Sequence, residues 1–342
     1  MIELAEILLE PRPHPFWRVL KQVGVNAAVG VLPRHFSDWR DSAPELPWEY
    51  GPLALYKGQV EEAGLKLAVI EDNPPMDAIR LGRAGREEEL EAFSTLIRNM
   101  GKLGIPVLCY NWMAVIGWLR TSVAACGRGG ALVSAYDHSV LKDAPLTRAG
   151  TVYEEQLWTN LEWFLERVVP VAEEAGVKLA LHPDDPPLSP IRGIARIMTS
   201  VDAFQRAIEL TPSEANGVTF CQGNFTLMTD DLPRAIRQFG EQQKIFFVHF
   251  RDVVGTPESF VETFHEEGKS DMLACIRAYL DVGYDGMLRT DHVPALEGDS
   301  AEVPGYSRNA RLFAIGYIKG LLEAAGSEQA DHQTSTKRMG AK

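Results

Sequence analysis

The sequence lacks the signatures of several large classes of protein. No uncharged apolar stretch approaches the roughly 18 residues that a membrane-spanning helix needs. The first residues, MIELAEILLEPRPHP, carry acidic side chains within the apolar run and no basic segment, which is not typical of a secretion signal. No GxGxxG or GxxxxGK[ST] motif follows a predicted strand, so nothing indicates binding of a dinucleotide or of a P-loop nucleotide.

Cysteines and basic clusters are also scarce. The four cysteines form no CxxC pair and fit no compact disulfide framework, which favours a reduced, cytoplasmic protein. The net charge is −13, and the densest basic patch is the pair Lys337 and Arg338. This balance disfavours nucleic acids and membranes as partners. An anionic small molecule would need a local metal ion or arginine.

Eight short apolar runs alternate with longer amphipathic stretches along the chain. The runs are residues 2–9, 24–32, 65–71, 105–111, 177–183, 217–223, 245–252 and 286–292. They are almost continuously apolar, which is typical of parallel strands buried on both faces. Helical spacing of apolar residues predicts helices over 52–64, 85–102, 153–175, 200–210, 230–242, 271–282 and 308–325. Eight such units predict an α/β protein with a closed (β/α)₈ barrel, the TIM barrel.

The barrel is expected to form one domain, residues 1–326, because no linker and no repeat of fixed period divides the chain. Residues 122–150 are rich in Gly, Ser and Ala without a clear period, and they predict a long loop over one face of the barrel. Residues 327–342 lack apolar side chains, so we expect a disordered tail.

Four potential metal ligands stand at the ends of the last four predicted strands: His182, Cys221, His249 and Asp291. Active sites of such barrels lie at the C-terminal ends of the strands, so these side chains should meet at one mouth. Two imidazoles, a thiolate and a carboxylate suit a divalent transition metal. Without a metal, burial would leave costly polar groups unpaired. The sequence therefore predicts a metal site.

Several motifs resemble the mannonate dehydratase family in order and spacing. They are LHPDDPP, CQGN, HFRDV, ETFHEEGKSDM, and RTDH followed by PGYSRNARLFAIGYIKGLLEA, together with the earlier stretch IRLGRAGREEELEAFSTLIRNMGKLGIPVLCYNWMAVIGWLRT. The similarity covers about residues 65–325. It implies a barrel related to the xylose-isomerase-like barrels that binds Mn²⁺ or a similar ion. The implied reaction converts D-mannonate into 2-keto-3-deoxy-D-gluconate and water.

The resemblance also implies roles for single residues. The family's metal ligands fall on the four residues reached above, and its proposed acid/base residues fall on His292 and Tyr306. Dehydration removes a proton beside the substrate carboxylate and hydroxide from the next carbon, through a metal-stabilised enediolate. A histidine titrating near neutral pH suits such a proton transfer. Tyr306 stands in a Pro-Gly-Tyr turn that can place its hydroxyl over the mouth of the barrel.

Further residues are predicted to bind the substrate or to support the site. Arg251 and Arg311 are expected to grip the substrate carboxylate, since a guanidinium can pair with both of its oxygens. Asn111 is expected to bind a sugar hydroxyl, and His265 to contact the substrate from a loop. Asp184, with its neighbour Asp185, is expected to orient His182 or nearby hydroxyls.

The chain departs from the family pattern in its N-terminal half. Met76 stands where the family has a histidine, Gly117 replaces an acidic residue, and LAEILLEPRPHPFW lacks the arginine of the family's Phe-Arg-Trp stretch. These changes leave open a different sugar acid, an isomerase or epimerase acting through the same metal site, and a non-catalytic paralogue that binds a sugar acid. The predicted ligand set also leaves Fe²⁺, Co²⁺ and Zn²⁺ open beside Mn²⁺. We further expect self-association into a dimer or tetramer.

Overall fold

A closed barrel of eight parallel strands forms the centre of the molecule. The computed structural model describes residues 1–36, 43–300 and 303–339. Around the barrel the strands follow the order β1-β12-β9-β8-β7-β4-β3-β2. Their bounds are β1 (Glu3–Ile7), β2 (Ala27–Gly30), β3 (Lys66–Glu71), β4 (Val107–Asn111), β7 (Lys178–His182), β8 (Asn216–Cys221), β9 (Ile245–Phe250) and β12 (Met287–Thr290). Each of the eight predicted runs overlaps one of these strands, so the predicted TIM barrel is confirmed.

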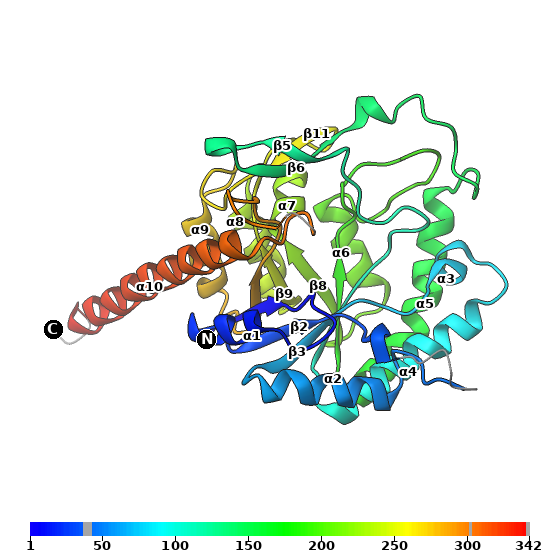
Figure 1. Ribbon diagram of the computed structural model, residues 1–342, viewed down its shortest axis with the longest axis horizontal. Coiled ribbons are helices and arrows are strands. Elements are labelled where there is room, and N and C mark those ends of the chain that lie inside the picture. Colours follow the sequence, from blue (N-terminus) through cyan, green and yellow to red (C-terminus); the bar gives the residue numbers. More distant parts are fainter. Residues whose placement is uncertain (37–42, 301–302, 340–342) are drawn as a thin grey trace.

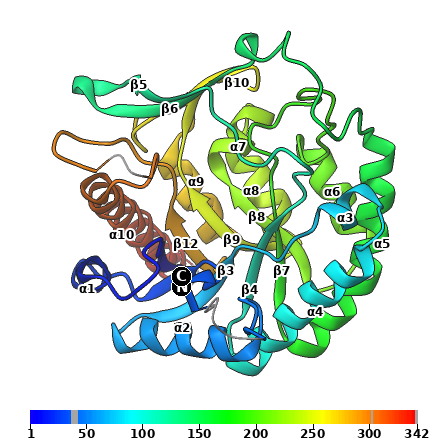
Figure 2. The same ribbon diagram turned by 45° about the vertical axis from the view of Figure 1, so that its right-hand side comes forward.

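Helices surround this barrel, as Figure 2 shows for α2, α4, α5, α6, α8 and α9. The helices are α1 (Pro15–Gln22), α2 (Tyr50–Glu62), α3 (Asp77–Leu81), α4 (Arg86–Leu103), α5 (Glu154–Ala175), α6 (Val201–Leu210), α7 (Gln222–Met228), α8 (Leu232–Glu241), α9 (Met272–Asp281) and α10 (Arg308–Met339). The seven predicted helices are confirmed, whereas the short α1, α3 and α7 were not predicted. Ser200 caps α6 by accepting from the backbone N–H of Ala203, and Gly176 ends α5 at φ +67°.

Alternate residues of the strands enter two different apolar layers. In β4, Leu108 and Tyr110 pack in the layer between strands and helices, together with Phe93 and Phe164. Val107 and Cys109 instead belong to the cluster inside the barrel. Because side chains of a strand alternate between its faces, residues two apart reach the same side. The interior cluster contains several alanines, and the larger polar side chains gather at the ends of the strands.

A second, smaller sheet covers the C-terminal end of the barrel. Its order is β10-β11-β6-β5, with bounds β5 (Ser122–Cys126), β6 (Leu132–Asp137), β10 (Val253–Thr256) and β11 (Ser259–Glu262). The prediction of one long loop over residues 122–150 is therefore wrong for β5 and β6. Their sequences, SVAAC and LVSAYD, are short and show no clear period, and β6 is ordered by pairing with β11 on one side and β5 on the other.

The last helix, α10, extends away from the barrel (Figure 1). It continues through the segment after residue 326 to Met339. Residues 340–342 lie outside the described residues, and the disordered tail remains a prediction. None of the described helices is both long enough and apolar enough to cross a membrane.

Candidate metal centre

A cavity of about 380 Å³ opens at the C-terminal end of the barrel. Its walls include residues from five of the barrel strands or the turns that follow them. Among them are Glu71, Asn111, His182, His249 and Asp291. The predicted convergence of side chains from distant parts of the sequence is present in this structure.

His182 and His249 point one ring nitrogen at each other. His182 Nδ1 donates to the carbonyl oxygen of Pro183 at 2.7 Å, which leaves Nε2 as the nitrogen with a lone pair. Burial lowers the pKa of His182, so its ring stays neutral. His249 Nε2 lies 3.3 Å from Glu71 Oε2, which favours the proton on Nε2 and a lone pair on Nδ1. The two lone-pair nitrogens, His182 Nε2 and His249 Nδ1, are 3.2 Å apart.

This arrangement fits a shared cation. Two imidazole nitrogens that bind one ion at about 2.1 Å are separated by roughly 3.0–3.4 Å in octahedral or tetrahedral geometry. Each ring is also oriented through its other nitrogen, by a carbonyl oxygen or a carboxylate, as is usual for metal-binding histidines. The donor atoms of His182, Cys221 and His249 all lie within 4.8 Å of one another.

Asp291 completes the predicted ligand set. Its Oδ2 lies 3.7 Å from Cys221 Sγ and 3.6 Å from His249 Nδ1. Burial alone would raise the pKa of Asp291, but the nearby basic side chains outweigh this effect and hold that pKa well below its usual range. These side chains are His292, Arg289, His249 and Arg251. The carboxylate is therefore ionised and available to a cation.

A second group of potential ligands, Glu71, Cys109 and His249, lies beside the first. Glu71 already accepts two hydrogen bonds from Arg289, at 2.9 and 2.7 Å. Burial raises the pKa of Cys109 well above its usual value, so the sulfur remains a thiol. A neutral thiol is a poor ligand, and the two facing histidines occur together only in the first group, so we favour the group that contains Cys221.

His292 and Tyr306 stand next to these ligands. The ring of His292 is held edge-on between those of Tyr306 and Trp118, with centroids 5.5 and 5.4 Å away. The Tyr306 hydroxyl donates to Asp291 Oδ1 at 3.1 Å. Burial and the charge of Asp291 raise the pKa of Tyr306 well above its usual value, so the hydroxyl keeps its proton. Both predicted acid/base residues line the cavity.

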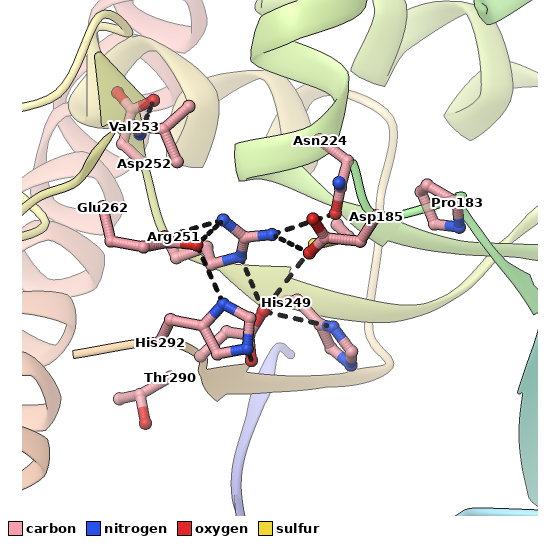
Figure 3. A network of polar contacts seen from close by, with 12 residues as sticks. Pro183, Asp185, Asn224, His249, Arg251, Asp252, Val253, Glu262, Thr290 and His292 are labelled. Carbon is pink, nitrogen blue, oxygen red and sulfur yellow. Dashed lines mark hydrogen bonds and ion pairs between the residues drawn. The ribbon is translucent and has the colours of Figure 1, made fainter. Parts of the chain in front are cut away.

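A network of buried charges lies behind this site, with Arg251 at its centre (Figure 3). Arg251 is 1% exposed, and all three of its nitrogens donate to protein acceptors. The acceptors are Asp291 Oδ2 (2.7 Å), both carboxylate oxygens of Glu262 (3.0 and 2.8 Å), Asp185 Oδ2 (2.9 Å) and Asn224 Oδ1 (3.0 Å). In this structure Arg251 therefore orients Asp291, a predicted metal ligand, and is not among the residues that line the cavity.

Glu262 connects the small sheet to His292. It lies on β11, is 2% exposed, and accepts from His292 Nδ1 at 3.0 Å. Arg120 also donates to Glu262. Burial alone would raise the pKa of Glu262, but Arg251, His292 and Arg120 outweigh it and lower that pKa to about 2. Sequence reasoning missed Glu262 and Arg120, because Arg120 and Glu262 are 142 residues apart in the chain.

The remaining predicted residues occupy different places. Asn111 lines the cavity. Arg311 donates to the carbonyl oxygen of Ile7 and lies 3.2 Å from Glu6, away from the cavity. His265 is buried outside the cavity wall, and burial lowers its pKa to about 4. Asp184 accepts from the backbone N–H of Met198 at 2.8 Å, and its neighbour Asp185 lines the cavity instead.

Two of the three departures from the family pattern, Met76 and Gly117, lie outside the cavity wall. Met76 is 1% exposed and packs its sulfur 3.9 Å from Arg80 Nη2. A Cβ added to Gly117 would have no neighbour within 4 Å. Neither residue is among those that line the cavity.

Comparison with known proteins agrees with this geometry. The family model described as D-mannonate dehydratase (UxuA) matches residues 18–151 and 145–332. A mannonate dehydratase of Thermotoga maritima is 36% identical over 336 residues, covering 88% of this chain and 91% of that protein. The crystal structure of mannonate dehydratase from Streptococcus suis serotype 2 superposes with a TM-score of 0.85 at 32% identity, covering 96% of this chain and 95% of that chain.

A more distant structure shares the fold alone. An L-ribulose 3-epimerase superposes with a TM-score of 0.61 at 17% identity, covering 96% of this chain and 97% of that chain. The barrel is thus common to dehydratases and epimerases, whereas the two mannonate dehydratases named above are 32–36% identical along most of this chain. This chain belongs to the mannonate dehydratase family and is a hydro-lyase.

Proposed function

We propose that this protein dehydrates D-mannonate to 2-keto-3-deoxy-D-gluconate, with Mn²⁺ held by His182, Cys221, His249 and Asp291. The observation that carries the metal site is the pair of imidazole nitrogens that face each other at 3.2 Å while their partner nitrogens lie against oxygen acceptors. A divalent ion bound there supplies Lewis-acid stabilisation of the negative charge that develops on the substrate during proton removal. We place the active protein in the cytoplasm, as a dimer or tetramer.

His292 and Tyr306 share the two proton transfers in this proposal. Glu262 accepts from His292 Nδ1, so the other ring nitrogen, Nε2, is the one free to exchange a proton with the substrate. The Tyr306 hydroxyl keeps its proton and can donate to the hydroxyl that leaves. Trp118 packs against the ring of His292 at the rim of the cavity, which limits the access of water to it.

We expect replacement of Glu262 by glutamine to slow turnover and to destabilise the protein. His292, Arg251 and Arg120 all donate to Oε1 of Glu262, and Arg251 donates to Oε2 as well. A glutamine removes the negative charge and places an NH₂ donor where one of these oxygens stood, so at least one of these donors loses an acceptor. A buried donor left without an acceptor costs roughly 1–3 kcal/mol of folding stability. We expect kcat to fall by about tenfold, within the range that general acid–base catalysis contributes. Steady-state kinetics and urea unfolding measure the two effects.

Glu266→Gln is the matched control for this variant. Glu266 is an exposed residue of the segment after β11, and it pairs with Arg128 at the surface. An exposed ion pair contributes at most about 1 kcal/mol, so kcat should stay at the wild-type value. A Glu262→Gln protein that keeps the wild-type kcat would remove Glu262 from the account.

The proposed function is tested by offering the purified, Mn²⁺-supplemented protein a panel of hexonates and pentonates and measuring 2-keto-3-deoxy acid formation. We expect turnover of D-mannonate that a chelator abolishes and added Mn²⁺ restores. Turnover of another sugar acid without turnover of D-mannonate would contradict the proposed substrate. Formation of an isomerised sugar without loss of water would contradict dehydration itself.

A further inference from the structure

The part of the cavity wall that the structure describes offers an anionic substrate no uncommitted guanidinium. Among the described residues that line it, Arg289 is the single arginine. Arg289 donates from Nε and Nη2 to Glu71 and from Nη1 to the carbonyl oxygen of Thr290. The wall also carries the carboxylates of Glu71, Asp72, Asp185 and Asp291. Within the described ranges 1–36, 43–300 and 303–339, the groups left to receive the substrate carboxylate are therefore neutral donors and the bound metal ion.

Asn111 is a neutral donor whose orientation the protein fixes. Its Oδ1 accepts from Arg80 Nη2 at 3.0 Å and from the backbone N–H of Met113 at 3.1 Å. Both of these groups can only donate, so the amide oxygen must face them and the amide nitrogen must face away. Within the described part of the chain, no hydrogen bond uses Asn111 Nδ2. Asn111 lines the cavity and lies directly opposite His182 in the pairing of β4 with β7.

Arg80 stands behind this amide, outside the cavity wall. It comes from α3, is 7% exposed, and also donates from Nη2 to the backbone oxygen of Asn111 at 2.8 Å. Hydrogen bonds from an ionised donor are stronger than neutral ones, and linked hydrogen bonds polarise one another. The guanidinium therefore both locks the Asn111 carboxamide and makes its N–H groups better donors.

We infer that Asn111 Nδ2 binds the substrate carboxylate and that Arg80 is the residue that positions it. This inference rests on the proposed function. A carboxylate can only accept hydrogen bonds, whereas a sugar hydroxyl can also donate. The acidic residues of the wall can satisfy hydroxyls but not a carboxylate. The fixed donor beside the metal ligands is therefore better matched to the charged end of the substrate than to a hydroxyl.

The test compares Asn111→Ala with Asn111→Asp in the Mn²⁺-loaded protein. A hydrogen bond to a charged group contributes about 1.5–3 kcal/mol, so Asn111→Ala should raise the KM for D-mannonate roughly 10- to 100-fold. Asn111→Asp should raise it further, because two carboxylates would then face each other. Manganese content, measured in each variant, should remain at the wild-type level.

Variants of Arg80 test the positioning role. Arg80→Gln keeps a donor for Asn111 but removes the charge, so we expect a several-fold rise in KM with kcat little changed. Arg80→Lys should restore part of the loss. Arg83→Gln, an exposed arginine two residues beyond the end of α3, is the control and should match the wild type.

Two results would overturn the inference. A KM for Asn111→Asp at or below that of Asn111→Ala would mean that Asn111 faces a hydroxyl. Unchanged KM values in both variants would mean that it faces no part of the substrate. If the wild-type protein itself leaves D-mannonate unchanged, the proposed function fails instead, so the two failures can be told apart.

Discussion

Replacing His292 with asparagine is expected to reduce kcat by about 10²–10⁴-fold, the range that general acid–base catalysis supplies. The asparagine amide nitrogen can occupy the place of Nδ1 and still donate to Glu262. Nothing in asparagine replaces Nε2, the ring nitrogen that we assign to the proton transfer. The measurement is steady-state turnover of D-mannonate, with the manganese content determined on the same sample.

The metal content of His292→Asn should equal that of the wild type, because the ligands are other side chains. His138→Asn is the matched control, since His138 follows β6 in the small sheet and does not line the cavity. Retention of full activity by His292→Asn would exclude His292 from the mechanism. Loss of manganese together with activity would instead place His292 among the ligands.

Replacing Cys221 with serine is expected to lower metal content and activity together. A thiolate is a strong ligand for a divalent transition metal, whereas a serine hydroxyl remains protonated at neutral pH and binds weakly. Loss of a contact that merely supports a ligand costs roughly 10- to 100-fold in metal affinity, so loss of a ligand should cost at least as much. Elemental analysis after dialysis, followed by activity at increasing Mn²⁺, measures both quantities.

Cys109→Ser separates the two candidate ligand groups. Cys109 is buried in the same barrel and belongs to the group with Glu71, but its thiol accepts from the Thr219 hydroxyl at 3.1 Å. We expect Cys109→Ser to bind manganese as the wild type does. A Cys109→Ser protein that loses manganese while Cys221→Ser keeps it would move the metal to the neighbouring group.

Two features could be predicted from the sequence because they depend on local patterns. They are the barrel itself and the convergence of four potential metal ligands at one of its ends. Each strand is a continuous apolar run, and His182, Cys221 and Asp291 stand where such a run ends. Parallel strands in a barrel bring their C-terminal ends together whatever the intervening sequence. A residue at the end of a strand can thus be placed without knowledge of its neighbours.

The partners of the site could not be predicted in the same way. Arg251 directly follows β9, the strand that carries His249, and this local position suggested a substrate contact. Its actual acceptors come from four other segments, and one of them, Glu262, lies on the same sheet as β5 and β6, where the sequence shows no clear strand period. Ion pairs between residues that are far apart in the chain produce no periodic pattern in the sequence, so they cannot be predicted from it.

The role of Arg80 was hidden for a related reason. It lies on α3, a helix of 5 residues that is too short to show helical periodicity. Its contact with Asn111 spans 31 residues and depends on how that helix packs beside the end of β4.

Anomalous diffraction at the manganese edge, from crystals grown with Mn²⁺, tests most directly the claim that one ion at the mouth of the barrel defines this active site. We predict one strong peak about 2.0–2.3 Å from His182 Nε2, His249 Nδ1, Cys221 Sγ and an Asp291 oxygen, as is usual for nitrogen, sulfur and carboxylate ligands. A peak between Glu71 and Cys109, or no peak at the mouth in protein that turns over D-mannonate, would contradict the account.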